Sequence, residues 1–296
     1  MTDLTAADVD EIRRFLSDTR GDVLSWLPAR WEPGWKSEAA SELGNAEAGP
    51  NAPWGDRPVR TAYAEAQLFL YASLDSLAAL GDSVNVMTTT YVPHVLARAA
   101  MEAGSQAWWL LEPKIGARRR VIRGILVRAS SARYVGKAAR KLDPVAGTAT
   151  TYGEDQAKVR AYAADLGLTY VCNDSTYCET DVLPSYNQRA ADFEKALFSK
   201  AAYAIYSGAA HAELYAVSQG WRISPQASDD DPLWERQPDR IAVWAAVISA
   251  SGFAMIPAYR AITLLGKNAR KKEFHDTIRN MGQMVRKMDL PREWIY

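Results

Sequence analysis

The segment around His211 contains the residue best suited to moving a proton. Tyr206 and Ser207 precede His211 by five and four residues, in a stretch of small residues typical of a helix. Residues four apart share a helix face, so the Ser207 hydroxyl and the imidazole can form a hydrogen bond. Because histidine titrates near neutral pH, we predict His211 as a general acid or base that Ser207 or Tyr206 positions. A packing histidine with satisfied hydrogen bonds is the alternative.

A second candidate pair is formed by Arg98 and Glu102, which are four residues apart and surrounded by alanines. Small neighbours allow another helix to approach closely, so each charge would need the other to offset its desolvation. One interpretation is therefore a structural ion pair at a helix packing surface. The other is an anion-binding Arg98 that Glu102 holds in orientation.

An arginine-rich stretch follows Pro113 and begins the next expected helix. Arg119 and Arg123 share one face of it. Clustered guanidinium groups suit phosphate or carboxylate, although a charged stripe of this kind also occurs as a plain solvent-facing surface. The candidate site has His211, Arg98 and Arg123 as predicted catalytic residues and Glu102, Arg119, Tyr206 and Ser207 as predicted binding residues.

The sequence shows no motif for a metal or a nucleotide cofactor. The Glu-x-x-His spacing of helical di-iron proteins is absent, and the acidic run 229–231 lies in an expected loop. Cys172 and Cys178, with three histidines in the chain, do not give the spacing of a zinc site and are interpreted as reduced thiols. Glycine-rich nucleotide fingerprints and the Gly-x-Ser-x-Gly elbow are also missing. We therefore expect no metal and no other cofactor.

These residues must be positioned by helices, because nearly every periodic segment has helical spacing. We expect an all-α helical bundle with no substantial sheet, one brief strand near Tyr170 and an ordered, aromatic-rich loop between Pro28 and Pro58. Residues 1–59 supply the N-terminal helix and this loop, and residues 60–296 supply the α-helical bundle, as one continuous domain. The other helices are expected at 61–80, 94–112, 115–142, 154–166, 186–219, 239–265 and 267–288.

Composition limits the possible partners and compartment. The 296 residues include 35 Lys plus Arg and 35 Asp plus Glu, so a strongly basic nucleic-acid surface is not expected. The polar, acidic start lacks the pattern of a targeting peptide, and the most apolar segment, 241–265, is interrupted by polar residues and reads as a buried helix. We expect a cytoplasmic protein that does not bind a membrane.

Several segments together resemble uncharacterised actinobacterial helical proteins similar to the HEPN-like group, in which an Arg-x-x-x-Glu helix and a late Ser-x-x-x-His helix recur. The resemblance covers roughly residues 60 to 220. It implies a homodimer and, for many members, RNA cleavage by an Arg-x-x-x-x-His motif. Tyr206 stands where that motif has arginine, so Arg98 or Arg123 would have to supply the cation. The matching segments are 93–102, 108–113, 119–123, 184–185 and 206–211.

The leading hypothesis is therefore an HEPN-like protein whose polar pocket binds an anion, either RNA phosphate or a small anionic ligand, with a metal-independent ribonuclease-like activity. Two alternatives remain open. The same residues can form a buried polar network in a non-catalytic interaction or scaffold protein. The ten Trp and fourteen Tyr can instead line the pocket of a small-molecule enzyme of a biosynthetic pathway, capped by residues 28–58.

Overall fold

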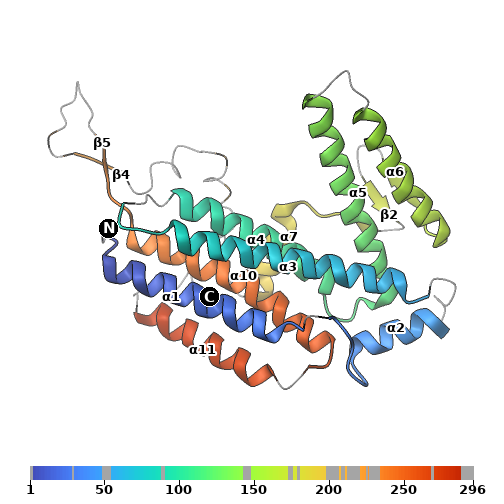
Figure 1. Cartoon of the computed structure of the whole chain (residues 1–296), viewed down its shortest axis with the longest axis horizontal. Helices are drawn as coiled ribbons and strands as arrows, with labels where there is room; N and C mark the ends of the chain where they lie inside the picture. Colours follow the sequence, from blue (N-terminus) through green and yellow to red (C-terminus); the bar gives the residue numbers. More distant parts are fainter. Residues whose placement is uncertain are drawn as a thin grey trace.

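A computed structural model of the chain confirms the all-α helical bundle (Figure 1). The residues it describes are 3–28, 30–48, 55–87, 91–142, 148–172, 176–178, 181–197, 207, 211, 221–224, 226, 234–267 and 270–287. The helices among them are α1 (Ala6–Trp26), α2 (Glu38–Ala48), α3 (Arg57–Ser83), α4 (Tyr91–Leu111), α5 (Gly116–Leu142), α6 (Thr148–Asp165), α7 (Tyr186–Leu197), α10 (Arg240–Leu264) and α11 (Lys271–Lys287).

Capping residues define the beginnings of three helices. At α1, the Thr5 side chain accepts from the Asp8 backbone while the Asp8 carboxylate accepts from the Thr5 backbone. Asp239 caps α10 by accepting from the backbone N–H groups of Ile241 and Ala242. At α7, Ser185 and Gln188 form the same reciprocal pair. These local signals explain why the start of each helix is close to the position that the sequence predicts.

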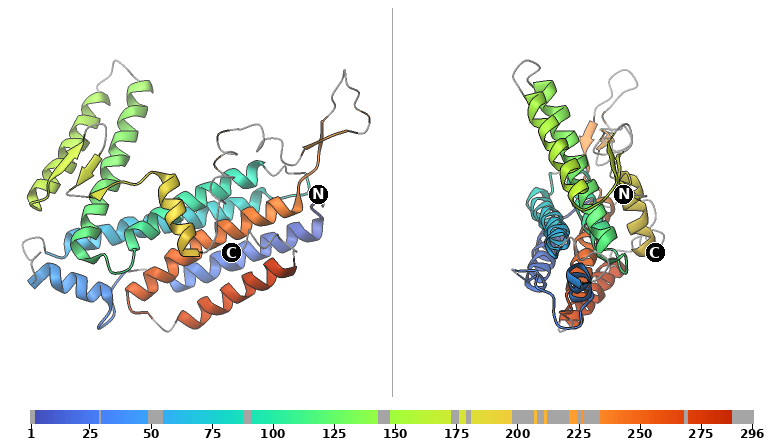
Figure 2. Two further views of the ribbon diagram at one scale, coloured as in Figure 1. Left: turned by 180° about the vertical axis from the view of Figure 1, so that it is seen from behind. Right: turned by 90° about the vertical axis from the view of Figure 1, so that its right-hand side faces the viewer.

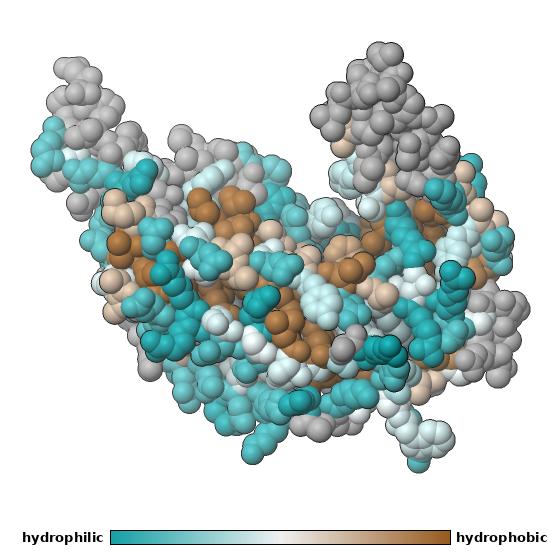
Figure 3. Space-filling view, viewed as in Figure 1, coloured by the Kyte–Doolittle hydropathy of each residue, from teal (hydrophilic) through white to brown (hydrophobic). Residues whose placement is uncertain are grey.

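The core of the bundle is built by α1, α3, α4 and α10, which lie side by side along the longest axis of the molecule (Figures 1 and 2). Helix α10 is apolar around most of its circumference and is buried because α1, α3 and α4 all contact it. Helix α11 packs against α10 and α1, and α7 packs on α4. Figure 3 shows apolar residues over the middle of one face of this bundle, between hydrophilic ones.

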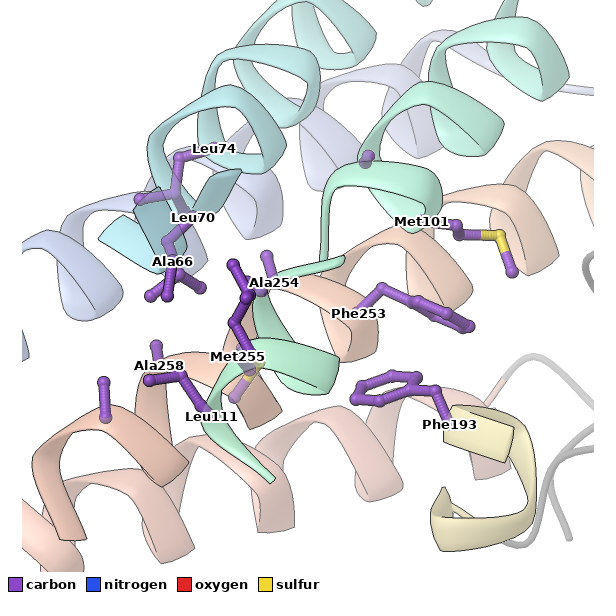
Figure 4. Packing of buried hydrophobic residues seen from close by; sticks show 14 of the residues in the cluster. Ala66, Leu70, Leu74, Met101, Leu111, Phe193, Phe253, Ala254, Met255 and Ala258 are labelled. Atoms are coloured by element: carbon purple, nitrogen blue, oxygen red, sulfur yellow. The ribbon is translucent and has the colours of Figure 1, made fainter. Parts of the chain in front are cut away.

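Close helix contact at the centre depends on a glycine and on aromatic packing. A Cβ atom at Gly104 would lie 2.0 Å from the backbone oxygen of Phe253, so α4 and α10 touch there without a side chain between them. Figure 4 shows the Phe253 ring of α10 beside the Phe193 ring of α7, with ring centroids 4.3 Å apart. Both rings are buried, which fixes α7 to the bundle.

Helices α5 and α6 form a hairpin that projects from one end of the bundle (Figures 1 and 2). Its base carries a small antiparallel sheet of β1 (Tyr170–Cys172), β2 (Thr176–Cys178) and β3 (Asp181–Val182), which confirms the brief strand near Tyr170. A two-stranded ribbon of β4 (Trp221–Ile223) and β5 (Trp234–Arg236) projects near the other end. Both sheets are small, as expected.

The segment between Pro28 and Pro58 differs from the predicted loop, because it contains helix α2. Ala39 and Leu43 of α2 are buried, and its Glu42 binds a buried arginine of α5. Trp31 packs partly against the core, whereas Trp35 is 90% exposed. The predicted helix 186–219 begins as expected with α7, and residues 207 and 211 are its other described residues. Residues 198–206, 208–210 and 212–219 lie outside the described ranges.

Candidate functional site

A pocket of about 740 Å³ lies between the end of α4, the start of α5 and the segment from β3 to α7. This volume suits a small organic molecule. Charged and aromatic side chains from all three segments line it, including Trp108, Trp109, Arg119, Arg123, Asp181 and Arg189. The structure therefore brings together two of the predicted site residues, Arg119 and Arg123, with others that lie far along the chain.

Arg123 lines the pocket and is held in place by several contacts. Its Nη2 atom lies 2.6 Å from Glu112 Oε2, its Nη1 donates to the Trp109 carbonyl, and its guanidinium carbon lies 4.7 Å from the centre of the Trp109 ring. The side chain is buried, and burial lowers the pKa of the guanidinium from its usual value. Arg123 therefore stabilises the negative end of α4 and orients the Trp109 indole.

Arg119 is a solvent-facing arginine of the pocket. Its Nε atom lies 2.8 Å from Asp181 Oδ2, and this hydrogen bond raises the pKa of the guanidinium. The Arg119 side chain is 53% exposed, so the pair lies largely in solvent on the arginine side. The Asp181 side chain is only 15% exposed, so the two partners of this ion pair differ in their access to solvent.

Arg189 is a pocket residue that the sequence interpretation missed. Its Nη1 donates to the Pro184 carbonyl, and its guanidinium carbon lies 4.4 Å from the centre of the Tyr186 ring. The sequence feature that could have pointed to Arg189 is the Ser185–Gln188 capping pair. It begins α7 at Tyr186 and so places Arg189 in the first turn. That signal defines the helix start but not the long-range contact with α4 and α5.

The other predicted residues gather farther toward the beginning of α4. Arg98 Nε lies 2.7 Å from Glu102 Oε1, so their spacing produces the ion pair it predicts. Arg98 Nη1 also lies 3.4 Å from the Ser207 carbonyl oxygen, which accepts the His211 backbone N–H at 3.1 Å. His211 is exposed and Ser207 is half-buried, while Tyr206 lies outside the described residues. Arg98, Glu102, Ser207 and His211 therefore form one group, which we call the Arg98 group.

The pocket and the Arg98 group are separate along α4. The acidic partners of the two arginines, Glu102 and Glu112, are ten residues apart, or about 15 Å of helix. Tyr186 lies between the groups: burial is the main factor that raises the pKa of its hydroxyl, and the Glu102 carboxylate raises it further while Arg189 lowers it. Arg98 and Arg123 therefore have different acidic partners, and their joint role at one phosphate stays a prediction.

Comparison of the chain with protein-family models, curated proteins and solved structures finds no significant match. The resemblance to the HEPN-like group therefore stays a prediction.

Proposed function

We propose that this protein binds a small anionic ligand in the pocket between α4, α5 and α7, with Arg119 as the side chain that contacts the anion. The observation that carries this proposal is the half-exposed guanidinium of Arg119 at a pocket of about 740 Å³ that two further arginines line. Trp108 and Trp109 supply aromatic surface beside it, and both are partly buried against the core. A ligand with an acidic group and an apolar ring fits this combination.

The three arginines have different parts in this proposal. Arg123 and Arg189 are almost fully buried and donate to backbone carbonyls, and Arg123 also pairs with Glu112, so both side chains are held in place in the pocket wall. Arg119 can turn from Asp181 to a ligand carboxylate or phosphate and form two parallel hydrogen bonds with it. Binding would thus replace one solvent-facing ion pair with a less solvated one.

Calorimetric titration of the purified protein with indole-3-propionate tests the proposal. We expect saturable binding that Arg119→Gln weakens at least about ten-fold, which corresponds to ~1.4 kcal/mol. Arg118→Gln is the matched control, because Arg118 is the exposed neighbour on the same helix and does not line the pocket. Equal weakening by both variants would show a general charge effect and contradict a specific site.

The Arg98 group favours a second candidate function, metal-independent cleavage of RNA. Arg98 and the His211 backbone converge on one carbonyl oxygen, so a cation and an exposed imidazole-bearing residue lie close together. In this candidate mechanism His211 takes the proton of the ribose 2′-hydroxyl, the 2′-oxygen bonds to phosphorus as the bond to the 5′-oxygen breaks, and water protonates the leaving 5′-oxygen. Arg98 stabilises the developing negative charge on the phosphate, and the predicted homodimer is the active unit. Ser207 contributes its backbone carbonyl oxygen to the Arg98 group, as the acceptor for Arg98 and for the His211 backbone.

Incubation with a mixed single-stranded RNA pool tests this second candidate. Wild-type protein should cleave the pool, and His211→Ala and Arg98→Ala should each abolish cleavage while retaining the wild-type circular dichroism spectrum and melting temperature. His275→Ala, at another exposed histidine, should cleave normally. Absence of cleavage by the wild-type protein would rule the candidate out without affecting the pocket.

A further inference from the structure

We infer that the ligand of the pocket is amphoteric: a small molecule that carries one anionic and one cationic group on an aromatic body. This inference rests on the proposed function, because it specifies the ligand of the same pocket. Its basis is the Arg119–Asp181 ion pair, whose two side chains differ strongly in their exposure to solvent.

The exposure of the two partners determines what can replace each of them. The Arg119 side chain is 53% exposed, whereas that of Asp181 is 15% exposed. An anion that took Arg119 alone would leave the Asp181 carboxylate without its hydrogen-bond donor, facing only the charge of Arg123, which Glu112 already pairs, and losing a partner in this way is costly. A ligand ammonium group that binds Asp181 at the same time removes this cost. The ligand would insert between the two side chains and satisfy both.

The overall charge of the pocket supports the same ligand class. Three guanidinium groups line the pocket, and so do three carboxylates, those of Glu112, Asp181 and Asp192. A polyanion such as RNA would meet all three carboxylates at close range, which disfavours it. A molecule with one charge of each sign experiences no net repulsion from this lining. The balanced charge of the pocket therefore discriminates against polyanions.

Aromatic side chains complete the ligand description. Trp108 packs edge-on against Phe193, with ring centroids 5.5 Å apart and planes 72° apart, and this contact holds the indole in place. Pro113 and Val182 add apolar surface to the lining. A flat, aromatic body between the charged groups would cover this surface and exclude water from the ion pairs.

Three related probes test the inference by calorimetry: L-tryptophan, indole-3-propionate, which lacks the amine, and tryptamine, which lacks the carboxylate. We expect L-tryptophan to bind at least about ten-fold more tightly than either analogue. Arg119→Gln should weaken the binding of L-tryptophan and of indole-3-propionate. Asp181→Asn should weaken the binding of L-tryptophan and of tryptamine. Because Asp181→Asn removes the carboxylate that competes for Arg119, it should strengthen the binding of indole-3-propionate. Arg118→Gln should leave all three affinities unchanged.

The outcomes separate this inference from the proposed function. If the protein binds L-tryptophan and indole-3-propionate with equal affinity, and Asp181→Asn raises both affinities, the inference of an amphoteric ligand is wrong and the proposed anion site stands. Failure of all three probes to bind the folded wild-type protein would overturn both. Tighter binding of a single-stranded oligonucleotide than of L-tryptophan, lost in Arg119→Gln, would replace the small ligand with RNA.

Discussion

Three arginine side chains bind successive backbone carbonyls at the end of α4. Arg123 donates to the Trp109 carbonyl, Arg120 to that of Leu110, and Arg260 to that of Leu111, the last at 2.6 Å. The final carbonyls of a helix have no partner within it and carry the negative end of its dipole, so guanidinium groups satisfy them well. These three guanidinium groups therefore have a structural role, whereas Arg119, which lines the pocket, faces solvent.

Arg120 has the most buried of these guanidinium groups, and its removal should strongly destabilise the fold. The side chain is 0% exposed and binds both oxygens of Glu42, with 2.7 Å contacts, while the Tyr63 hydroxyl donates to Glu42 at 2.6 Å. Arg120→Met would leave the Glu42 carboxylate buried without its cation, at a cost of about 3–5 kcal/mol. Urea unfolding measures this loss.

A double variant tests the reason for that loss. Arg120→Met combined with Glu42→Leu removes both charges, so it should recover much of the free energy of unfolding that the single variant loses. A double variant as unstable as Arg120→Met alone would show that the arginine acts through its carbonyl contacts instead. The same experiment indicates how firmly α2 is attached to the bundle.

His94 should make stability depend on pH. It is 2% exposed, and burial lowers its pKa from 6.5 to about 4, with Asp239 and a backbone hydrogen bond to Ala242 opposing the shift. The unfolded chain therefore binds a proton between about pH 6.5 and pH 4 that the folded chain does not. The contribution is fully present above pH 6.5 and falls by about 2–3 kcal/mol as the pH drops to 4.5.

Unfolding of wild type and His94→Gln by urea at pH 7.5 and 4.5 checks this prediction. The wild-type protein should lose about 2–3 kcal/mol more than the variant between the two pH values, since the variant lacks the titrating imidazole. His275→Gln, at an exposed position, serves as the control and should follow the wild type. Parallel losses in wild type and His94→Gln would contradict the role assigned to His94.

At the scale of elements, the contact between α4 and α10 has no room for a side chain at Gly104. Because an added Cβ would meet the Phe253 backbone oxygen at 2.0 Å, Gly104→Ala must push the helices apart. We expect a loss of about 3 kcal/mol in the free energy of unfolding. Gly21→Ala in α1, where nothing lies within 4 Å, should be neutral or stabilise by up to about 1 kcal/mol. Differential scanning calorimetry of both variants distinguishes packing from helix propensity.

Helix α5 carries both buried and solvent-facing arginines. Its sequence has many basic and no acidic residues, a pattern that also fits a solvent-facing stripe. In the structure, Arg118 and Arg119 are exposed, whereas Arg120 and Arg123 are buried. The difference follows from rotation about the helix axis: one face of α5 meets α2 and the end of α4, and the adjacent face meets solvent and β3.

At the scale of the whole molecule, α10 is long and apolar enough to cross a membrane by length and composition, yet 78% of its most apolar window is buried inside the protein. Arg240 at its start pairs with Asp8 at 2.7 Å, and Arg260 near its end pairs with Glu38 at 2.7 Å. Insertion would break these pairs and expose the faces of α1, α3 and α4. We therefore expect the protein to enter the aqueous phase on Triton X-114 separation, and recovery in the detergent phase would contradict this assignment.

The helices and several of their boundaries could be predicted from the sequence, because caps and apolar periodicity are local. Thr5, Asp239 and the Ser185–Gln188 pair act within one turn, and the apolar run of α10 reads as a buried helix without knowledge of its neighbours. The Arg98–Glu102 pair belongs to the same class, since four residues make one turn. Helix α2 was missed because proline and glycine flank it and its stabilising partners lie on other helices.

Only the tertiary structure decided which arginines face the pocket and which are buried. Arg119 meets Asp181 across 62 residues, and Arg260 meets Glu38 across 222. No local pattern encodes such pairs, because they depend on how whole helices are rotated and stacked. The sequence by itself determined an all-α bundle rich in arginine; the packing of α2, α4, α5 and α7 determined that one of these arginines, Arg119, combines a solvent-facing guanidinium with a sheltered carboxylate partner.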